Sequence, residues 1–337
     1  MTLKYNNSYI NEVSTVAGPY VIYGPFKYDE TFTDYYDNEE TFEKCEIKNY
    51  IKCINILLGK CNKSENDIDL IISSDLLNQL MISNFMMNHF NIPFFGVYNA
   101  CASFCEELIL ASTLIDSKKM NNIITATSSN NLTAERQYRN PVEYGYQKKK
   151  YQTFTVTGSA SCLISNKKSN IKITTATIGK VVDFDVKDSL NMGKVMAPSA
   201  YETFITHLKE LNLKPEYYDL ILTGDLGKYG KTIFNELFYK NFGYYLSNYE
   251  DSACMIYDNN DKRVLAGGSG IACINLVTNS YVIPQMISKK YKRVLLIATG
   301  ALMSVTSVNQ KMSIPSISHA VSLEVIWVIY ILLYLLE

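Results

Sequence analysis

Two segments of this chain recur in the same order, and this repetition limits the folds available to it more than any other feature. The segment DLIISSDL at residues 69–76 is matched by DLILTGDL at residues 219–226. Further along the chain, IITATS at residues 123–128 is matched by LLIATG at residues 295–300. The interval between partners is longer for the second pair, which indicates an insertion of about 22 residues in the second copy.

A third pair of segments lies between these two. YNACASFCEEL at residues 98–108 and AGGSGIACINL at residues 266–276 each place a turn of small residues before a helical pattern. An ordered series of matches predicts a duplicated unit, with an N-terminal half at 1–168 and a C-terminal half at 169–323. Residues 324–337 follow as an atypical apolar tail.

Within the first half, strand patterns alternate with helical patterns. Residues 92–100, 121–129 and 152–165 have the apolar, β-branched character of strands. Residues 78–90, and the stretch that follows Cys101, carry apolar residues at helical spacing. Alternation of this kind predicts an α/β fold with largely parallel central strands.

The composition excludes several classes of protein. The chain is 47% hydrophobic and 19% charged with a formal net charge of −1, which is typical of a globular protein and gives no overall field that would favour nucleic acid. We interpret the lysine run at 148–150 as part of a solvated loop. The eight cysteines form no CxxC pair and the three histidines are scattered, so a metal site is not expected. The first residues lack the pattern of a signal peptide, which predicts folding in a reducing compartment.

Cys101 lies where a strand pattern meets a helical pattern, a common place for a nucleophilic thiol. The positive end of a helix dipole stabilises a thiolate, and the small neighbours Ala100, Ala102 and Ser103 would let a ligand approach closely. The residues leave three alternatives for Cys101: a nucleophile, a residue that lines a binding pocket, or a thiol that only packs.

The motifs of the chain resemble those of a known superfamily. A duplicated α/β unit with a cysteine at a strand-to-helix turn in its first copy resembles the thiolase superfamily, which includes thiolases and ketoacyl synthases. More closely, the chain is similar over about residues 15–323 to the family of stage V sporulation protein AD (SpoVAD) of endospore-forming bacteria. The segments that carry this similarity are DLLNQ, YNACASFCE, ATSSNNLTAERQYRNPVEYGYQ, TVTGSAS, ITTATIGKVVD, MAPSA, YDLILTGDL and LAGGSGIAC. The resemblance implies a thiolase-like five-layer αβαβα sandwich made of two pseudo-symmetric halves.

The same resemblance implies a function and a set of partners. It implies a protein that binds dipicolinic acid, as the free acid or as its calcium chelate, for uptake into the developing spore during sporulation. It also implies synthesis in the cytoplasm, a peripheral position at the spore inner membrane, and integral membrane proteins of the same sporulation operon as partners. No resident cofactor is expected, and calcium enters only as part of the chelate. A homodimer through the strand at 121–129 is expected as well.

Condensing enzymes of the superfamily combine the cysteine with a histidine, and with an asparagine or a second histidine, from the second half. The matching loops of this chain hold Asp225 and the turn at 267–270, without a histidine. A carboxylate beside the thiol would raise its pKa, and losing a coupled catalytic partner costs several orders of magnitude in rate. We therefore expect a non-catalytic pocket with Cys101 as a vestigial nucleophile. An acyltransferase or condensing enzyme that uses Cys101 is the alternative, and a scaffold for a membrane channel complex is the second alternative.

Arginine is the side chain that best matches a dicarboxylate such as dipicolinate, because it binds planar carboxylates through two parallel hydrogen bonds. The segment 130–151 has no counterpart in the second half, is expected to be a long loop, and carries Arg136 and Arg139. Either arginine could instead form an ion pair with Glu135 or Glu143.

Hydroxyls, carboxylates and helix N-termini complete the candidate contacts. Thr155, Thr157 and Ser159 alternate along one predicted strand and could donate hydroxyl groups, although strand propensity alone also explains them. Asp75 and Asp225 occupy equivalent loops, where they could face calcium or form a structural pair. The candidate ligand-binding set is Cys101, Asp75, Ser129, Arg136, Arg139, Thr157, Asp225 and Ser269.

The apolar run VIWVIYILLYLL at residues 325–336 departs from the short polar ending that the resemblance implies. A helix that spans a bilayer needs about 20 apolar residues, so a run of about 12 is too short to span alone. The run could be an interfacial anchor, a truncated span or the product of a reading-frame change. We favour a reading-frame change, or a partial fusion to a neighbouring membrane protein, over an evolved anchor. The core fold is expected to be complete by about residue 323.

Overall fold

The computed structural model describes residues 1–138, 148–258 and 260–326. Their main strands form one continuous sheet that divides into two five-stranded halves. The first half contains β2 (Tyr9–Ala17), β4 (Leu70–Ser74), β5 (Phe94–Gly96), β6 (Asn122–Ser129) and β8 (Gly158–Ser165). The second half contains β9 (Ile171–Thr177), β10 (Leu220–Thr223), β11 (Tyr249–Asp251), β13 (Arg293–Ala301) and β14 (Ser316–Val325). Four short strands complete the set: β1 (Thr2–Lys4), β3 (Glu30–Thr31), β7 (Phe154–Thr155) and β12 (Gly268–Ser269).

The two halves have the same strand order and the same directions. The first half runs β5-β4-β6-β8-β2, and the second runs β11-β10-β13-β14-β9. In each half the three strands at the outer end are parallel, and the last two are antiparallel to their neighbours. Contact between β2 and β9 joins the halves into one sheet. The turn between β8 and β9 contains residue 168, where the sequence analysis places the boundary.

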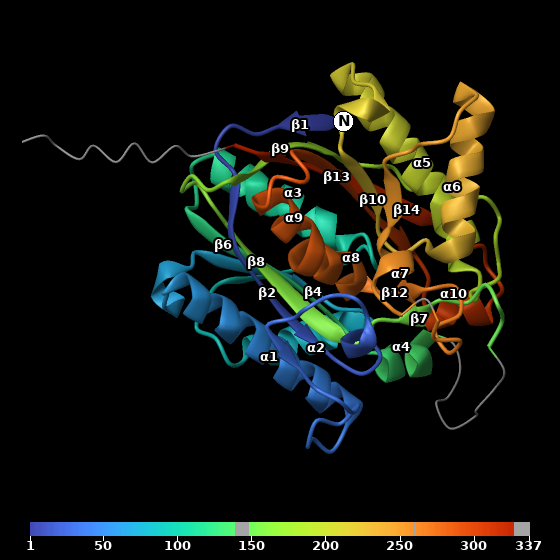
Figure 1. Cartoon of the computed structure of the whole chain (residues 1–337). Coiled ribbons are helices and arrows are strands. Elements are labelled where there is room, and N and C mark those ends of the chain that lie inside the picture. The colour runs from blue at the N-terminus through green and yellow to red at the C-terminus, as the bar shows by residue number, and fades with distance from the viewer. Residues whose placement is uncertain (139–147, 259, 327–337) are drawn as a thin grey trace, which may run out of the picture.

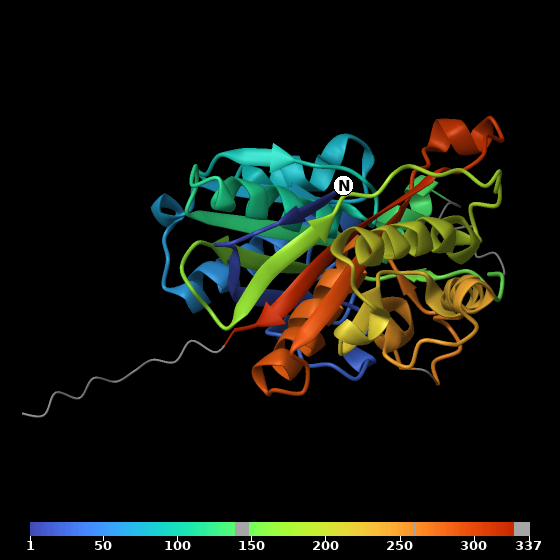
Figure 2. The ribbon, with the colours of Figure 1, turned by 90° about the horizontal axis from the view of Figure 1, so that it is seen from above.

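Helices form the other three layers. In the first half they are α1 (Phe42–Cys61), α2 (Met81–Met87), α3 (Ser103–Asp116) and α4 (Asn131–Tyr138). In the second half they are α5 (Met192–Leu211), α6 (Gly227–Phe242), α7 (Ser252–Met255), α8 (Ile271–Val277), α9 (Ile283–Ile287) and α10 (Val305–Asn309). Helices α1 and α2 cover one outer face and α5 and α6 the other, with α3, α8 and α9 between the two half-sheets (Figure 1 and Figure 2). This arrangement is the five-layer αβαβα sandwich expected from the sequence.

The duplication extends to hydrogen bonds that end and position the elements. Helices α1 and α5 both end at an asparagine in the left-handed conformation, Asn62 and Asn212, which satisfies the last carbonyls without a glycine. In the first half, Asp69 Oδ2 accepts hydrogen bonds from two consecutive backbone N–H groups that begin β6. In the second half, Asp219 Oδ2 accepts the same pair of bonds at the start of β13. Equivalent residues therefore fix equivalent strands.

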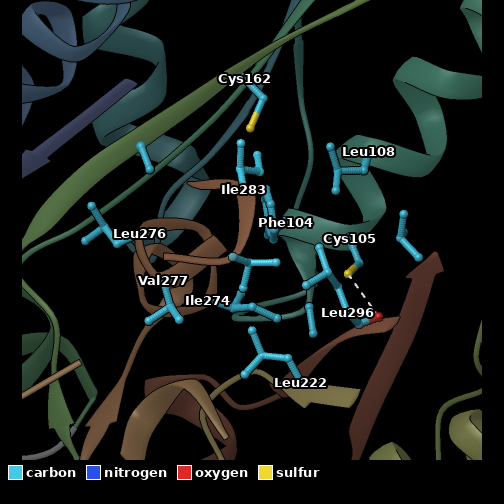
Figure 3. Packing of buried hydrophobic residues seen from close by; sticks show 14 of the residues in the cluster. Phe104, Cys105, Leu108, Cys162, Leu222, Ile274, Leu276, Val277, Ile283 and Leu296 are labelled. Carbon is cyan, nitrogen blue, oxygen red and sulfur yellow. Dashed lines mark hydrogen bonds between the residues drawn. The ribbon is translucent and has the colours of Figure 1, made fainter. Parts of the chain in front are cut away.

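The central helices carry much of the hydrophobic core. Phe104 and Leu108 of α3 pack with Ile274 and Val277 of α8 and with buried side chains of both half-sheets (Figure 3). Cys105, which follows Phe104 in α3, is fully buried, with its thiol 4.0 Å from the carbonyl of Leu296. Full burial of one such apolar side chain contributes about 1.5–3 kcal/mol. These contacts hold the two half-sheets at a fixed separation on either side of α3 and α8.

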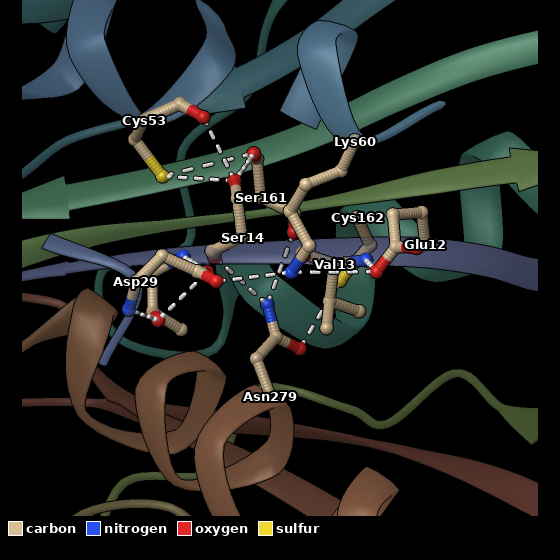
Figure 4. A network of polar contacts seen from close by, with 10 residues as sticks. Glu12, Val13, Ser14, Asp29, Cys53, Lys60, Ser161, Cys162 and Asn279 are labelled. Atoms are coloured by element: carbon tan, nitrogen blue, oxygen red, sulfur yellow. Dashed lines mark hydrogen bonds and ion pairs between the residues drawn. The ribbon is translucent and has the colours of Figure 1, made fainter. Parts of the chain in front are cut away.

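A buried polar network fixes the register of the central helix against the first half-sheet. Asn279, in the π-helical turn at 278–282 that follows α8, donates to the carbonyl of Ser161 at 3.0 Å and to that of Ser14 at 3.4 Å (Figure 4). The thiol of Cys162 donates to the Asn279 side-chain oxygen at 3.4 Å. Because a buried amide without partners is costly, these bonds specify one position of the helix along β2 and β8.

Three sequence expectations need correction or fall outside the description. The strand at 121–129, expected at a dimer interface, is β6, which pairs with β4 on one side and β8 on the other and so has no free edge. The segment 130–151, expected to be a loop, begins with helix α4. A short counterpart, α10, follows β13 in the second half. Most of the apolar run at 325–336 lies outside the described residues.

Candidate functional site

Cys101 lies in a tight turn just before helix α3. The Asn99 N–H donates to Ser103 Oγ at 2.7 Å, and the Asn99 carbonyl accepts from the Ala102 N–H at 3.1 Å. Ala100 between them has φ of 50°, a left-handed conformation that costs about 1–3 kcal/mol for a residue with a side chain. A Cβ at Gly300 of β13 would collide with the Asn99 carbonyl, so only glycine lets the turn approach this strand. The surrounding structure thus imposes the strained turn that presents Cys101.

Cys101 opens into a cavity between the two halves of the chain, with a free volume of about 50 Å³. This volume admits a few water molecules, so a larger ligand requires lining side chains to move. Three of the lining residues are methionines, whose unbranched side chains change conformation easily. The lining comprises Leu76, Tyr98, Ala100, Cys101, Ala134, Tyr138, Thr155, Met192, Met196, Asp225, Ser269, Gly270, Ala301 and Met303.

Asp225 is the buried carboxyl of this cavity. Its Oδ1 accepts a hydrogen bond from Thr299 Oγ1 at 2.7 Å, and its Oδ2 accepts one from the Gly270 N–H at 3.2 Å. The Cys101 thiol lies beside this carboxyl and favours its ionised form, which lowers its pKa. Burial raises the pKa of Asp225 to about 6, against the stabilising effect of these bonds. Asp225 therefore changes charge close to neutral pH.

A second buried carboxyl supports the loop that carries Asp225. Asp251 accepts hydrogen bonds from Thr223 Oγ1 at 2.6 Å and from the Gly227 N–H at 2.9 Å. Burial raises its pKa to about 7, and the nearby charge of Asp225 adds to the shift. Asp251 is not among the lining residues, so its role is to hold the 223–227 loop in place.

Three of the predicted site residues come together in this cavity. Cys101 belongs to the first half, and Asp225 and Ser269 belong to the second. Strand β12, which contains Ser269, pairs in parallel with β7, which places Ser269 opposite Thr155. Asp225 is the sole aspartate, glutamate, lysine or arginine in the described lining, and no histidine is among these residues. The arrangement offers hydroxyl donors, a thiol and one titrating carboxyl.

Three other predicted residues lie away from the cavity lining. Asp75 accepts hydrogen bonds from the backbone N–H groups of Leu77 and Ser83, both at 2.8 Å, and so stabilises the start of α2. Ser129 donates to the Val156 carbonyl at 2.7 Å. Thr157 Oγ1 accepts from a backbone N–H at the start of α4 at 2.9 Å. These side chains already have structural partners.

The two predicted arginines have different outcomes. Arg136 forms an ion pair with Glu43 of α1, whereas the sequence analysis considered Glu135 and Glu143 as partners. It points away from the cavity because Ala134 and Tyr138, on the other side of α4, supply the lining. Arg139 lies outside the described residues.

Sequence reasoning missed most of the remaining lining. Tyr98 and Tyr138 form a hydrogen bond of 2.9 Å beside the cavity, and Tyr138 also donates to the Leu76 carbonyl. The spacing of Ala134 and Tyr138 is a helical signal that would have identified this face of α4. Nothing in the sequence distinguishes the lining methionines from core methionines.

The two buried histidines, His207 and His319, are neutral near pH 7 and form hydrogen bonds outside the described cavity lining. His319 Nδ1 accepts from the Gly179 N–H at 3.2 Å, and its Nε2 lies 3.5 Å from the side-chain nitrogen of Asn99. His207 is hydrogen-bonded to Thr177 and Tyr218. Burial lowers the pKa of both histidines to about 4. Neither is among the described residues that line the cavity.

Comparison with known proteins gives the family. Residues 1–324 match the family described as Stage V sporulation protein AD (SpoVAD). The chain is also 41% identical over 318 residues to Stage V sporulation protein AD of Bacillus subtilis (strain 168), a match that covers 94% of each chain. The chain belongs to the SpoVAD family. This finding confirms the resemblance drawn from the sequence motifs and makes the chain a sporulation protein.

Solved structures show the same fold as this SpoVAD-family chain. Its structure matches 3-oxoacyl-[acyl-carrier-protein] synthase III from Aquifex aeolicus VF5 with a TM-score of 0.56 and 13% identity, covering 94% of this chain and 99% of the other. It matches cerulenin-bound OleA of Xanthomonas campestris with a TM-score of 0.60 and 11% identity, covering 96% of this chain and 98% of the other. Identities this low establish the thiolase-like fold alone.

The described residues form neither a metal-binding cluster nor a membrane-spanning helix. No group of histidine, cysteine and carboxylate side chains among them is arranged to hold a metal ion. None of the helices formed by these residues has the length and apolar character needed to cross a bilayer.

Proposed function

We propose that this SpoVAD-family protein binds dipicolinic acid, or its calcium chelate, in the cavity beside Cys101 and serves its uptake into the developing spore. The observation that carries the proposal is the cavity at the interface of the halves, which brings Cys101 and Asp225 together in one lining. The carboxyl occupies the loop in which the condensing enzymes place a catalytic histidine. Such a site keeps a pocket with polar contacts, while its described lining lacks the imidazole that condensing enzymes pair with the cysteine.

The charge of Asp225 decides which form of the ligand the cavity accepts. A carboxylate repels a dianion strongly in a site from which water is excluded. Two conditions remove this repulsion. Either Asp225 carries a proton, or the calcium ion of the chelate lies between the Asp225 carboxylate and the carboxylates of dipicolinate. Calcium prefers oxygen ligands, which Asp225, Thr155 and Ser269 supply. Binding of the free acid should therefore depend on pH more than binding of the chelate.

A calorimetric titration tests the proposal directly. We expect saturable heat when dipicolinate, with and without equimolar calcium, is added to the whole protein. Ser269→Trp should abolish this binding because the indole fills the small cavity. Ser288→Trp, at an exposed position after α9, is the matched control and should bind as the unaltered protein does. Absence of binding for both ligand forms at millimolar concentration would refute the proposal.

The condensing-enzyme alternative is favoured by one observation, the strained turn that presents Cys101 to the cavity. We propose that the protein is nevertheless not an enzyme, because a carboxyl lies beside the thiol and no histidine is among the described residues that line the cavity. Incubation with an acyl thioester followed by mass spectrometry decides between the two. Rapid acylation that is lost in Cys101→Ser would support the enzyme, and an unmodified Cys101 supports a binding protein.

The scaffold alternative and the cellular position belong to the same proposal. A peripheral protein at the spore inner membrane would contact integral membrane proteins of its operon without a span of its own. Co-purification from detergent-solubilised spore membranes tests this association. If partners are recovered with a Ser269→Trp variant that no longer binds dipicolinate, assembly and ligand binding are separate functions. If no partner is recovered from either form, the membrane association is wrong.

The free edge of β5 supports a homodimer. Strand β5 pairs with β4 on one side, and no strand among the described residues pairs with its other side. Phe95 on this strand is 53% exposed. An exposed apolar edge strand is a natural site for pairing with a second copy, which buries both the side chain and the unpaired backbone groups. The proposed dimer interface is therefore β5, in place of the 121–129 strand.

A further inference from the structure

A second hollow, separate from the Cys101 cavity, lies on the surface. It has a volume of about 470 Å³ and opens to solvent beside the start of α6. The two sites share no lining residue in the described part of the chain. The lining of this lysine hollow comprises Lys150, Lys228, Tyr229, Thr232, Asp261, Lys262 and Leu265.

The lysine hollow carries uncompensated positive charge. Its three lysines come from three separate segments of the chain, which meet only in the folded protein. Lys228 Nζ donates to the carbonyl of Leu265 at 3.2 Å, a neutral partner. Among the residues that the structure describes, no acidic group forms an ion pair with Lys150, Lys228 or Lys262.

The acidic residue of the described lining is already neutralised. Asp261 accepts two parallel hydrogen bonds from Arg263, at 2.8 Å from Nε and 2.7 Å from the terminal nitrogen. This bond pair keeps the pKa of Asp261 below its usual value and the pKa of Arg263 above its own. The hollow therefore presents three ammonium groups, while its neighbouring guanidinium and carboxylate cancel each other.

We propose that the lysine hollow is a binding site for a phosphate group. Lysine ammonium groups act as compact point charges that suit the several oxygens of a phosphate approached from different sides. A planar carboxylate is bound best by an arginine fork, and the fork of Arg263 is occupied by Asp261. Phosphate is thus the anion that this set of side chains fits.

The proposal depends on the lysine side chains and not on the end of α6. The N–H of Gly227 already donates to Asp251 Oδ1 at 2.9 Å, and that of Lys228 donates to the Ala266 carbonyl at 2.8 Å. These backbone groups are unavailable to a ligand. The sequence analysis interprets the lysine run at 148–150 as part of a solvated loop. In the folded protein, Lys150 of this run lies beside residues far along the chain and so becomes part of the proposed binding site.

Calorimetric titration with inorganic phosphate and with glycerol 3-phosphate tests the site in the whole protein. Replacing all three lysines, Lys150→Gln, Lys228→Gln and Lys262→Gln, should weaken binding at least about tenfold, because the variant loses its charged hydrogen-bond donors to the phosphate oxygens. The control replaces three exposed lysines elsewhere, Lys167→Gln, Lys168→Gln and Lys214→Gln, with the same change in net charge. It should leave the affinity within about twofold, since distant surface charges are screened.

A vesicle arm distinguishes a free phosphate from a lipid headgroup. Flotation with vesicles containing phosphatidic acid, compared with pure phosphatidylcholine vesicles, reports binding to a membrane phosphate. The site is supported if a soluble phosphate or the phosphatidic acid vesicles bind, and if this binding is lost in the Lys150/Lys228/Lys262 variant and kept in the Lys167/Lys168/Lys214 control. The site is overturned if neither the soluble phosphates nor the vesicles bind, or if both triple variants lose binding equally. Ser269→Trp, which blocks the Cys101 cavity, should keep phosphate binding, so failure of this proposal and failure of dipicolinate binding give different results.

Discussion

At the scale of single residues, the contact between Cys101 and Asp225 sets the chemistry of the site. The thiol and the carboxyl come from different halves. The turn at Ala100 presents the thiol, and hydrogen bonds from Thr299 and Gly270 hold the carboxyl. Burial of Asp225 places its protonation near neutral pH. This single titration makes ligand charge and pH the variables that should control binding.

Asp225→Asn should remove the pH dependence of binding to free dipicolinate. In the unaltered protein, affinity for the calcium-free ligand is expected to fall as pH rises through about 6, because the carboxylate then repels the dianion. The amide carries no charge at any pH, so the variant should bind about tenfold more tightly than the unaltered protein at the alkaline end. Titrations across this pH range measure the effect, with Glu202→Gln on the exposed side of α5 as the control. Identical pH profiles for Asp225→Asn and the unaltered protein would contradict it.

Glu46→Gln should alter how stability depends on pH. Glu46 is buried, accepts hydrogen bonds from Ser128 and Thr133, and has its pKa raised from 4.5 to about 8 by burial, with the charge of Asp75 adding. Because the native carboxyl holds its proton more tightly than the unfolded one, the free energy of unfolding should fall as pH rises from 4.5 to about 8.

Glutamine has no proton to lose, so the free energy of unfolding of the Glu46→Gln variant should rise relative to that of the unaltered protein as pH increases from 4.5 to about 8. The expected gain is on the order of 1 kcal/mol per pH unit. Urea denaturation at several pH values measures it, and Glu202→Gln again serves as the exposed control. A stability difference that stays constant with pH would show that Glu46 is charged in the native protein throughout.

At the scale of elements, periodicity and turn residues predict most of the fold. The strand patterns at 69–76 and 219–226 become β4 and β10, and those at 123–128 and 295–300 become β6 and β13. Segment 130–151 was predicted to be a loop because its composition is polar and turn-rich. Its first part is helical because tertiary contacts hold it: the Asn131 N–H bonds to Thr157, and Thr133 bonds to the buried Glu46.

Gly193→Ala tests the close crossing of α5 and α6. The two helices meet at Gly193 and Gly230, where a Cβ on Gly193 would lie 2.7 Å from the backbone nitrogen of Gly230. We expect a loss of about 1–3 kcal/mol in the free energy of unfolding, since the backbones must separate. Gly59→Ala in α1 is the matched control, because no atom lies within 4 Å of its added Cβ. That change should stabilise the helix by about 0.5–1 kcal/mol, and a loss of similar size in both variants would contradict the crossing.

At the scale of the whole molecule, the two halves differ in the character of their outer edge strands. The first half ends in β5, with exposed Phe95, and the second ends in β11, whose Glu250 is paired with Lys231. A charged, paired residue discourages strand addition, whereas an apolar edge favours it. The duplicated fold therefore offers one edge for self-association.

Phe95→Glu should convert the proposed dimer into a monomer. Two carboxylates facing each other across a β5–β5 contact repel and remove the buried apolar area. Sedimentation velocity measures the change in mass, and circular dichroism checks that the fold is retained. Phe242→Glu, at an exposed aromatic residue on α6, is the control and should leave the mass unchanged. A Phe95→Glu variant that keeps the mass of a dimer would exclude this interface.

The sequence by itself determined the repeated elements and the positions of Cys101, Asp225 and Ser269 at the ends of strands. These are local properties, because periodicity and small turn residues act within a few positions along the chain. Asp75 and Asp225 lie in the same sequence motif, so the sequence did not indicate that the two aspartates have different roles.

Only the tertiary structure decided which candidates meet. Asp75 turns its carboxyl to two backbone N–H groups near α2, while Asp225 reaches across the interface of the halves to Cys101. Arg136 pairs with Glu43 of α1 and so is withdrawn from the cavity that its own helix lines. The cavity and the lysine hollow are each built by segments more than 100 residues apart along the chain. Side chains this distant are brought together by packing of whole elements, which no local pattern encodes.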